Sequence, residues 1–204
     1  MSTHGSMSTQ GSRPDPLTDI VLCPTTRRPP PEPAIGVSVA RRSRAAIIDG
    51  ARAAVTAHGS TLTMAQIAAR AGVSKATLYN HFRTREDVLG ELLLAEIDDL
   101  VSAVSHLRLA EALTRAARAI SEHPLLEALG EQDGGALTAL ARVDVRSAGW
   151  ARAAQATERL LREHGRRGTP TVLRWLASLV TAPADDRDIA ADVEVLVAGL
   201  PPAR

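Results

Sequence analysis

The chain has 204 residues, of which 45 % are hydrophobic, and its 24 basic and 23 acidic residues give a formal net charge of +1. Aromatic residues are scarce, because only Tyr79, Phe82, Trp150 and Trp175 occur, so any core must be aliphatic. Alanine and leucine favour helices, which disfavours immunoglobulin-like and barrel folds, and the composition excludes collagen-like and wholly disordered chains.

Two further features concern the compartment in which the chain works. Cys23 is the lone cysteine and cannot form an internal disulfide, which fits a reducing compartment. No apolar run approaches the roughly 20 residues of a membrane helix, and the N-terminus lacks the basic start and apolar centre of a signal peptide. We therefore expect a cytoplasmic protein with no membrane partner.

The small net charge hides an uneven distribution. Residues 41–85 contain eight basic residues and one acidic residue, a charge of +7, whereas residues 91–204 contain 13 arginines and 17 acidic residues, a charge of −4. The basic stretch is either a solvated arginine face or a surface for phosphates, and only a fold that directs it at phosphates favours the second interpretation.

Residues 1–40 are the first predicted segment, a disordered arm rich in proline and serine. Residues 1–6 are nearly repeated in residues 7–12, and the proline run at 29–33 fits neither a helix nor a central strand.

Four helices are predicted after this arm. The first ends with Gly59 as a left-handed cap, and Thr63 with Gln66 forms a capping box at the start of the second. Ser74 caps a third helix that runs to about residue 82, and Thr84 caps a longer fourth helix. The apolar stripe of the first helix consists of Ile47, Ile48, Ala51, Ala54 and Val55, and that of the fourth of Val88, Leu92, Ile97, Leu100, Val101 and Val104.

The rest of the chain also has a helical pattern. Thr169 and Pro170 are predicted as the N-cap and first residue of one helix. Further breaks are expected at residues 123–124, 134–135, 165–168, 183 and 201–202. These breaks leave about five more helices, and no alternating strand pattern occurs, so the predicted fold class is all-α with about nine helices.

Residues 63–82 have the pattern of two short helices joined by a tight turn. The residues that close this hairpin are Ile67, Ala68, Gly72, Val73, Leu78 and Phe82. The outward face of the second helix is then left with Lys75, Ala76, Tyr79 and Asn80. A helix-turn-helix lays such a face into the major groove of DNA.

The motif A-x-x-A-G-V-S-x-x-T-L-Y-x-H-F, realised by residues 68–82, resembles the TetR family of bacterial transcriptional regulators. The resemblance extends over residues 41 to about 95. It implies an N-terminal three-helix helix-turn-helix DNA-binding domain at 41–95 and a helical effector-binding and dimerisation domain at 96–204. It further implies a sequence-specific repressor that a small-molecule effector releases from double-stranded operator DNA.

The resemblance also implies roles for single residues. Lys75, Ala76 and Thr77 would meet base edges, the lysine at guanine and the two methyl groups at thymine. Asn80 is a further candidate base contact. Arg44, which lies ahead of the motif, either reaches the DNA or stays solvated. The residues implied to hold phosphates are Thr63, Tyr79, His81 and Arg85.

The C-terminal half is expected to hold an effector of unknown identity and to form a homodimer. Trp150 is either an aromatic wall of the effector pocket or a core residue. The predicted pocket is lined by Leu93, Leu100, Val104, Leu113, Ala117 and Trp150. The predicted dimer interface, which could instead close the core of one chain, consists of Val172, Leu176, Leu179, Val180, Ile189, Val193, Leu196 and Val197.

Two other function classes compete with this interpretation. An all-helical enzyme would need a nucleophile with a base, paired carboxylates or a metal cluster, and the sequence shows none of these arrangements. We therefore expect no catalytic residue, metal or cofactor. An architectural DNA-binding protein without an effector remains the second alternative.

Overall fold

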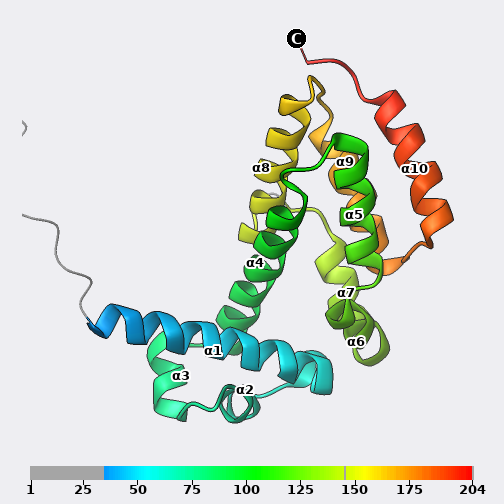
Figure 1. The fold of residues 1–204 in the computed structure, drawn as a ribbon. Helices are drawn as coiled ribbons and strands as arrows, with labels where there is room; N and C mark the ends of the chain where they lie inside the picture. Colours follow the sequence, from blue (N-terminus) through cyan, green and yellow to red (C-terminus); the bar gives the residue numbers. More distant parts are fainter. Residues whose placement is uncertain (1–34, 145, 204) are drawn as a thin grey trace, which may run out of the picture. The chain divides into compact units, whose positions relative to one another are not determined.

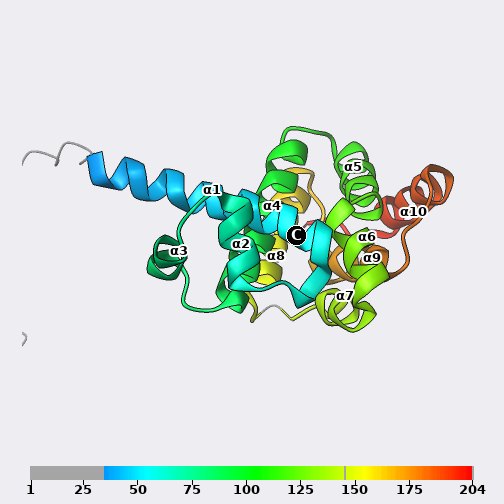
Figure 2. The same ribbon diagram turned by 90° about the horizontal axis from the view of Figure 1, so that it is seen from below.

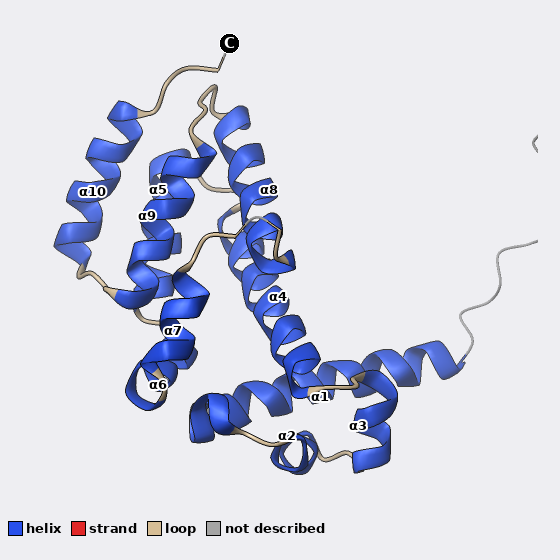
Figure 3. Ribbon diagram, turned by 180° about the vertical axis from the view of Figure 1, so that it is seen from behind, coloured by secondary structure: helices blue, strands red, loops and turns tan. Residues whose placement is uncertain are grey.

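The computed structural model describes residues 35–144 and 146–203, so most of the predicted arm at 1–40 lies outside the described residues. Within that range the chain forms ten α-helices, one 3-10 helix and no strand (Figure 3), which confirms the all-α fold class. The 3-10 helix spans Gly59–Thr61. The α-helices are α1 Ile35–His58, α2 Met64–Ala71, α3 Lys75–His81, α4 Arg85–Val104, α5 Leu109–Ser121, α6 Pro124–Gln132, α7 Gly134–Ala141, α8 Ala148–Glu163, α9 Thr169–Thr181 and α10 Asp186–Gly199.

The ends of these helices agree with most of the predicted breaks, with three differences. Helix α1 begins at Ile35, six residues before the predicted domain boundary at 41. The N-cap of α9 is Gly168, with φ of 129°, so Thr169 is the first helical residue and not the cap. The connections between α4 and α5 and between α7 and α8 contain no proline or glycine, and the sequence analysis therefore missed them.

The α2–α3 hairpin has the caps that its sequence predicts. The Gln66 backbone N–H donates to the Thr63 hydroxyl at 3.3 Å, and the Thr63 N–H donates to the Gln66 side chain at 2.7 Å. Gly72 ends α2 with φ of 64°, a conformation that glycine adopts without steric cost. The Ser74 hydroxyl accepts the Thr77 N–H at 3.0 Å and begins α3. These local bonds fix the direction of α3.

A first core holds α1 to α4 together, and it also includes α6 (Figures 1 and 2). Helix α1 packs against α2, α3, α4 and α6, so the α2–α3 hairpin and a helix from the second half of the chain share one scaffold. The buried residues of this core are Ile47, Ile48, Ala51, Ala54, Val55, Leu62, Ile67, Ala68, Leu78, Phe82, Val88, Leu92 and Leu125.

A second core joins α5, α8, α9 and α10, and it corrects part of the predicted dimer interface. Val172, Leu179, Ile189 and Val193 were expected on that interface, but each is at most 4 % exposed within one chain. They therefore pack inside the protomer, the alternative that the apolar stripes left open. The buried residues of this core are Leu109, Leu113, Ala117, Leu161, Val172, Leu179, Ile189, Val193 and Leu200.

No helix in the described part of the chain is both long and apolar enough to cross a membrane.

Gly50 allows α1 and α2 to approach closely. A Cβ at this position would lie 2.5 Å from the Ala71 backbone nitrogen and 2.6 Å from the Ala71 Cα. Gly90 on α4 is also a glycine within a helix, but a Cβ added there would meet nothing within 4 Å, so it serves as the control for Gly50.

We therefore expect Gly50→Ala to lower the free energy of unfolding by about 1–3 kcal/mol, because backbone atoms must move. Gly90→Ala should raise it by about 0.5–1 kcal/mol, because alanine favours a helix over glycine. Urea denaturation followed by circular dichroism measures both values. Equal stability of Gly50→Ala and the wild type would contradict the close packing of α1 on α2.

Candidate nucleic-acid interface and adjoining cavity

The outer face of α3 is exposed as the sequence predicts. Lys75, Ala76, Tyr79 and Asn80 are all exposed, whereas Leu78 on the opposite face is fully buried. Tyr79 is 52 % exposed, a high value for the chain's single tyrosine, and its ring does not contribute to the core. The helix thus presents one cation, one small methyl group, one phenol and one amide to the solvent.

Several other residues that were predicted to contact DNA already have partners within the chain. The Thr77 hydroxyl is 2.9 Å from the Ser74 hydroxyl in the first turn of α3. The Thr63 hydroxyl is bonded to Gln66 at 2.9 Å. His81 is half-buried, with its ring 6.5 Å from that of Phe82. Thr77 therefore has only its methyl group for the predicted thymine contact.

Arg85 begins α4 and forms an ion pair with its neighbour Glu86, Nη2 to Oε1 at 2.9 Å. The pKa of Glu86 lies below its ordinary value because backbone and Arg85 hydrogen bonds stabilise the carboxylate. The pair is exposed, and exposed ion pairs stabilise a fold little because water screens their charges. A phosphate can therefore replace Glu86 at little cost.

Arg44 occupies a different place from the one expected of a DNA contact. Its Nη2 lies 2.9 Å from Glu91 Oε1 on α4, and its guanidinium carbon is 4.7 Å from the centre of the Phe82 ring. Both contacts connect α1 to the other helices of the first core. The sequence analysis missed this role, because Glu91 is 47 positions away and no short motif links the two residues.

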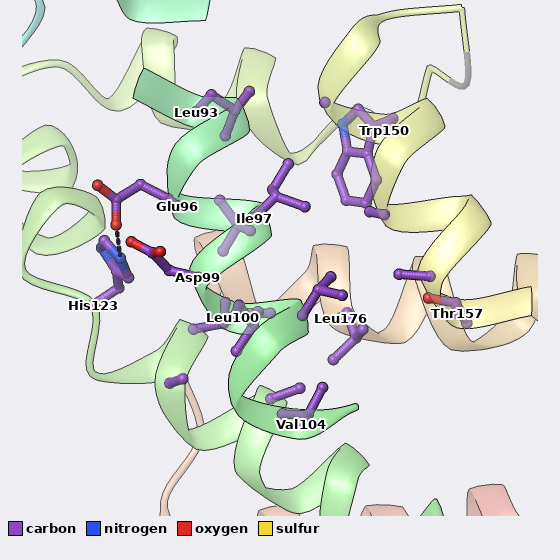
Figure 4. Close-up of a pocket in the computed structure, with 18 of the residues that line it drawn as sticks. Leu93, Glu96, Ile97, Asp99, Leu100, Val104, His123, Trp150, Thr157 and Leu176 are labelled. Atoms are coloured by element: carbon purple, nitrogen blue, oxygen red, sulfur yellow. Dashed lines mark hydrogen bonds and ion pairs between the residues drawn. The ribbon is translucent and has the colours of Figure 1, made fainter. Parts of the chain in front are cut away.

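A cavity of about 910 Å³ lies beside the first core, between α4, α5, α6, α8 and α9. Its wall is mostly apolar and includes Val55 of α1, a residue of the first core, so the cavity adjoins that core directly. Five of the six predicted pocket residues line it: Leu93, Leu100, Val104, Leu113 and Trp150. Figure 4 labels all of these except Leu113. Ala117 does not line the cavity and is fully buried in the second core.

Trp150 is a wall residue whose polar atom already has a partner. Its Nε1–H donates to the Leu140 carbonyl at 3.2 Å, so the ring contributes apolar surface to the cavity. Among the described residues, no group of three or more His, Cys, Asp or Glu side chains could hold a metal ion.

Glu96 is a polar residue of the cavity wall whose two carboxylate oxygens each have a partner outside α4. Its Oε1 accepts from Arg52 Nε of α1 at 2.6 Å, and its Oε2 lies 3.3 Å from His123 Nε2 (Figure 4). His123 Nδ1 accepts the Leu125 N–H at 3.3 Å and so caps α6, which leaves Nε2 as the protonated, donating nitrogen of the neutral ring. The sequence analysis missed this cluster, whose members are 44 and 27 positions apart.

The electrostatics of Glu96 follow from these partners. Burial alone would raise the pKa of Glu96, but hydrogen bonds from His123 and Arg52 outweigh burial and hold the pKa below its usual value of 4.5. The carboxylate therefore stabilises the folded chain above that pH, and this stabilisation is lost as the pH falls through the lowered pKa.

We expect Glu96→Gln to lower the free energy of unfolding at pH 7 by about 1 kcal/mol, because the amide keeps the shape but loses the charge. The difference from the wild type should shrink below about pH 4.5, where the wild-type carboxylate also becomes neutral. Denaturation curves at pH values from 7 to 3 measure it. A difference that stays constant over this range would refute the stabilising role of the charge.

Comparisons with known proteins agree with this geometry. Residues 47–92 match the family described as bacterial regulatory proteins, tetR family. A structure described as a TetR-family transcriptional regulator from Mesorhizobium loti MAFF303099 is 22 % identical, with 79 % of this chain and 98 % of that chain covered and a TM-score of 0.50. A TetR transcriptional regulator from Rhodococcus sp. RHA1 is 17 % identical over the same shares, with a TM-score of 0.53. These two likenesses show the fold. No curated protein matches the chain.

Proposed function

We propose that the chain, whose residues 47–92 match the tetR family of bacterial regulatory proteins, is a repressor of that family. It binds operator DNA as a homodimer in the bacterial cytoplasm, and a small molecule in the cavity releases it. The observation that carries the proposal is the exposed outer face of α3, on a helix whose opposite face is buried. Such a helix suits the major groove.

In the proposed complex, α3 reads the bases and flanking residues hold the backbone. Lys75 donates to guanine, the methyl groups of Ala76 and Thr77 touch thymine, and Asn80 contacts an adjacent base. Phosphates are held by Thr63, Tyr79, His81 and Arg85. Arg44, which the sequence left as either a DNA contact or a solvated residue, is not among the proposed DNA contacts, because its partners are Glu91 and Phe82.

Release of the operator follows from two conformations of the chain that differ in their affinity for DNA. An effector that binds better to a conformation with displaced recognition helices shifts the population toward it and lowers operator affinity. The mostly apolar wall supports a largely apolar effector. Linkage then requires operator DNA to weaken effector binding by the same factor.

The homodimer is proposed because paired half-sites about one turn of DNA apart need two recognition helices. Of the residues first assigned to the interface, Leu196 and Val197 on α10 remain partly exposed. Leu176 and Val180 are also partly exposed, but they line the cavity and are therefore not assigned to the contact. The neighbouring Val195 is 75 % exposed, which supports α10 as part of the contact.

Selection of duplexes from a random DNA library by the purified protein tests this function. We expect a two-fold symmetric sequence to be enriched and bound at least about 1,000-fold more tightly than random DNA. No enrichment would refute sequence-specific regulation. Strong binding without a preferred sequence would favour the architectural alternative.

We expect Lys75→Ala to lose the base preference at one position of each half-site, at about 1–3 kcal/mol, because the donor to guanine is gone. Arg162→Ala, which removes an exposed charge from α8, is the matched control and should leave the sequence preference unchanged. Repeated selection with each variant measures this. A preference in Lys75→Ala identical to the wild type would rule out a reading role for this lysine.

Arg85→Ala should weaken binding to all duplexes alike and reduce the slope of log K against log salt by about one, because one phosphate contact is lost. Titrations of operator and random duplexes at several salt concentrations provide the measurement. A loss confined to the operator would show that Arg85 contributes to base recognition instead.

A further inference from the structure

We propose that Glu96 transmits occupancy of the cavity to the DNA-facing helices, and that the effector is an apolar molecule with a cationic, hydrogen-bond-donating group that competes for its carboxylate. The inference rests on the proposed function, and it adds the chemical class of the effector and the residue that couples the two sites. It is built from the contacts that Glu96 makes with α1 and α6.

On the α1 side, Glu96 makes the shortest ionic contact between Arg52 and α4. Its Oε1 lies 2.6 Å from Arg52 Nε, and its side chain is only 19 % exposed. The other partners of Arg52 do not provide an equivalent link. Asp49, at 2.8 Å, is on α1 itself, and Asp99 on α4 is 3.8 Å away with a side chain that is 79 % exposed. Loss of the Glu96 contact therefore loosens α1 from α4.

On the α6 side, the same carboxylate orients His123. The ring donates to Glu96 with Nε2 and accepts the Leu125 N–H with Nδ1, and Leu125 belongs to the first core. Helix α6 packs against α1, so a displaced Glu96 disturbs α1 through this second route as well.

On the cavity side, the wall holds three carboxylates, Glu96, Asp99 and Glu163, and two arginines, Arg115 and Arg159, and is otherwise mostly apolar. Glu96 and Asp99 lie about one turn apart on α4, so negative charge gathers at this part of the wall. Each oxygen of Glu96 has one partner and keeps a second lone pair, which can accept from a donor on the ligand. An ammonium group held there attracts the carboxylate and weakens its hold on Arg52 and His123. The apolar part of the same molecule packs against apolar side chains that α5 and α6 contribute to the wall, such as Ile120 and Leu126. Figure 4 shows Glu96 and His123 together on one side of α4, with Trp150 of α8 on the other.

A second ion pair between α1 and α4 supplies a matched control. Glu91 pairs with Arg44 at 2.9 Å and its side chain is 35 % exposed, but Glu91 is not part of the cavity wall. Glu91→Gln therefore removes a link of the same chemistry between the same two helices, without changing the cavity.

The experiment uses the full chain, the selected operator duplex and dansylcadaverine, a fluorescent apolar molecule that ends in an ammonium group. The N-hexyl dansylamide of similar size, which ends in a methyl group, is the second probe. Fluorescence titration gives the concentration at which each probe fills the cavity. Operator affinity is then measured with and without a saturating concentration of each probe, for the wild type, Glu96→Gln and Glu91→Gln.

We expect dansylcadaverine to raise the operator Kd of the wild type and of Glu91→Gln about tenfold, within the usual range of allosteric coupling. The Kd of Glu96→Gln should change less than twofold, and the hexyl probe should have a smaller effect on the wild type than dansylcadaverine. Arg52→Gln, which leaves the cavity wall intact, should also lose the response, and it tests the proposal if Glu96→Gln does not fold.

Three outcomes would overturn the inference: an unchanged response in Glu96→Gln, an equal loss in Glu91→Gln, or no binding and no effect of dansylcadaverine on the wild type. In each of these cases operator binding itself remains intact. Failure of the proposed function is recognised separately, because no duplex would then be selected by the wild type.

Discussion

Helix α4 packs in the first core with one part of its length and lines the cavity with another. The arrangement of the other described helices depends on this double role of α4. Its first two turns place Val88 and Leu92 in the core that holds the recognition hairpin, where each is at most 4 % exposed. The following turns place Leu93, Leu100 and Val104 in the wall of the cavity. One continuous helix therefore contributes to both regions, so the packing of the cavity wall and that of the first core are physically connected.

Ion pairs between α1 and α4 also hold α4 in the first core. Two of the basic residues in the stretch from 41 to 85, Arg44 and Arg52, form ion pairs with Glu91 and Glu96 of α4. The charge of +7 in this stretch is therefore partly paired within the chain. The acidic residues of α4 therefore determine which arginines hold the scaffold together.

Features set by neighbouring residues could be predicted from the sequence. The capping box at Thr63, the left-handed Gly72 and the cap at Ser74 each depend on residues within three positions, and all are present. The exposed face of α3 follows from the helical period once these caps fix the helix. The pocket residues on α4 were predicted for the same reason.

Features set by distant residues could not be predicted. The pairing of Arg52 with Glu96 spans 44 positions, and no periodicity specifies it. Val172 and Ile189 belong to apolar stripes that look alike whether they face a partner or their own core. Ala117 was assigned to the pocket but lies in the second core, because the pattern of α5 does not tell which of its apolar residues meet α4.

One measurement tests the central claim, that the exposed face of α3 contacts DNA, most directly. Tyr79 is the chain's single tyrosine and is 52 % exposed on that face, so a protein labelled with 3-fluorotyrosine gives one ¹⁹F resonance from this position. The account predicts that the resonance shifts and becomes less accessible to solvent when the selected operator is added, and that random DNA has a smaller effect. A resonance that stays unchanged while the operator is bound would contradict the account.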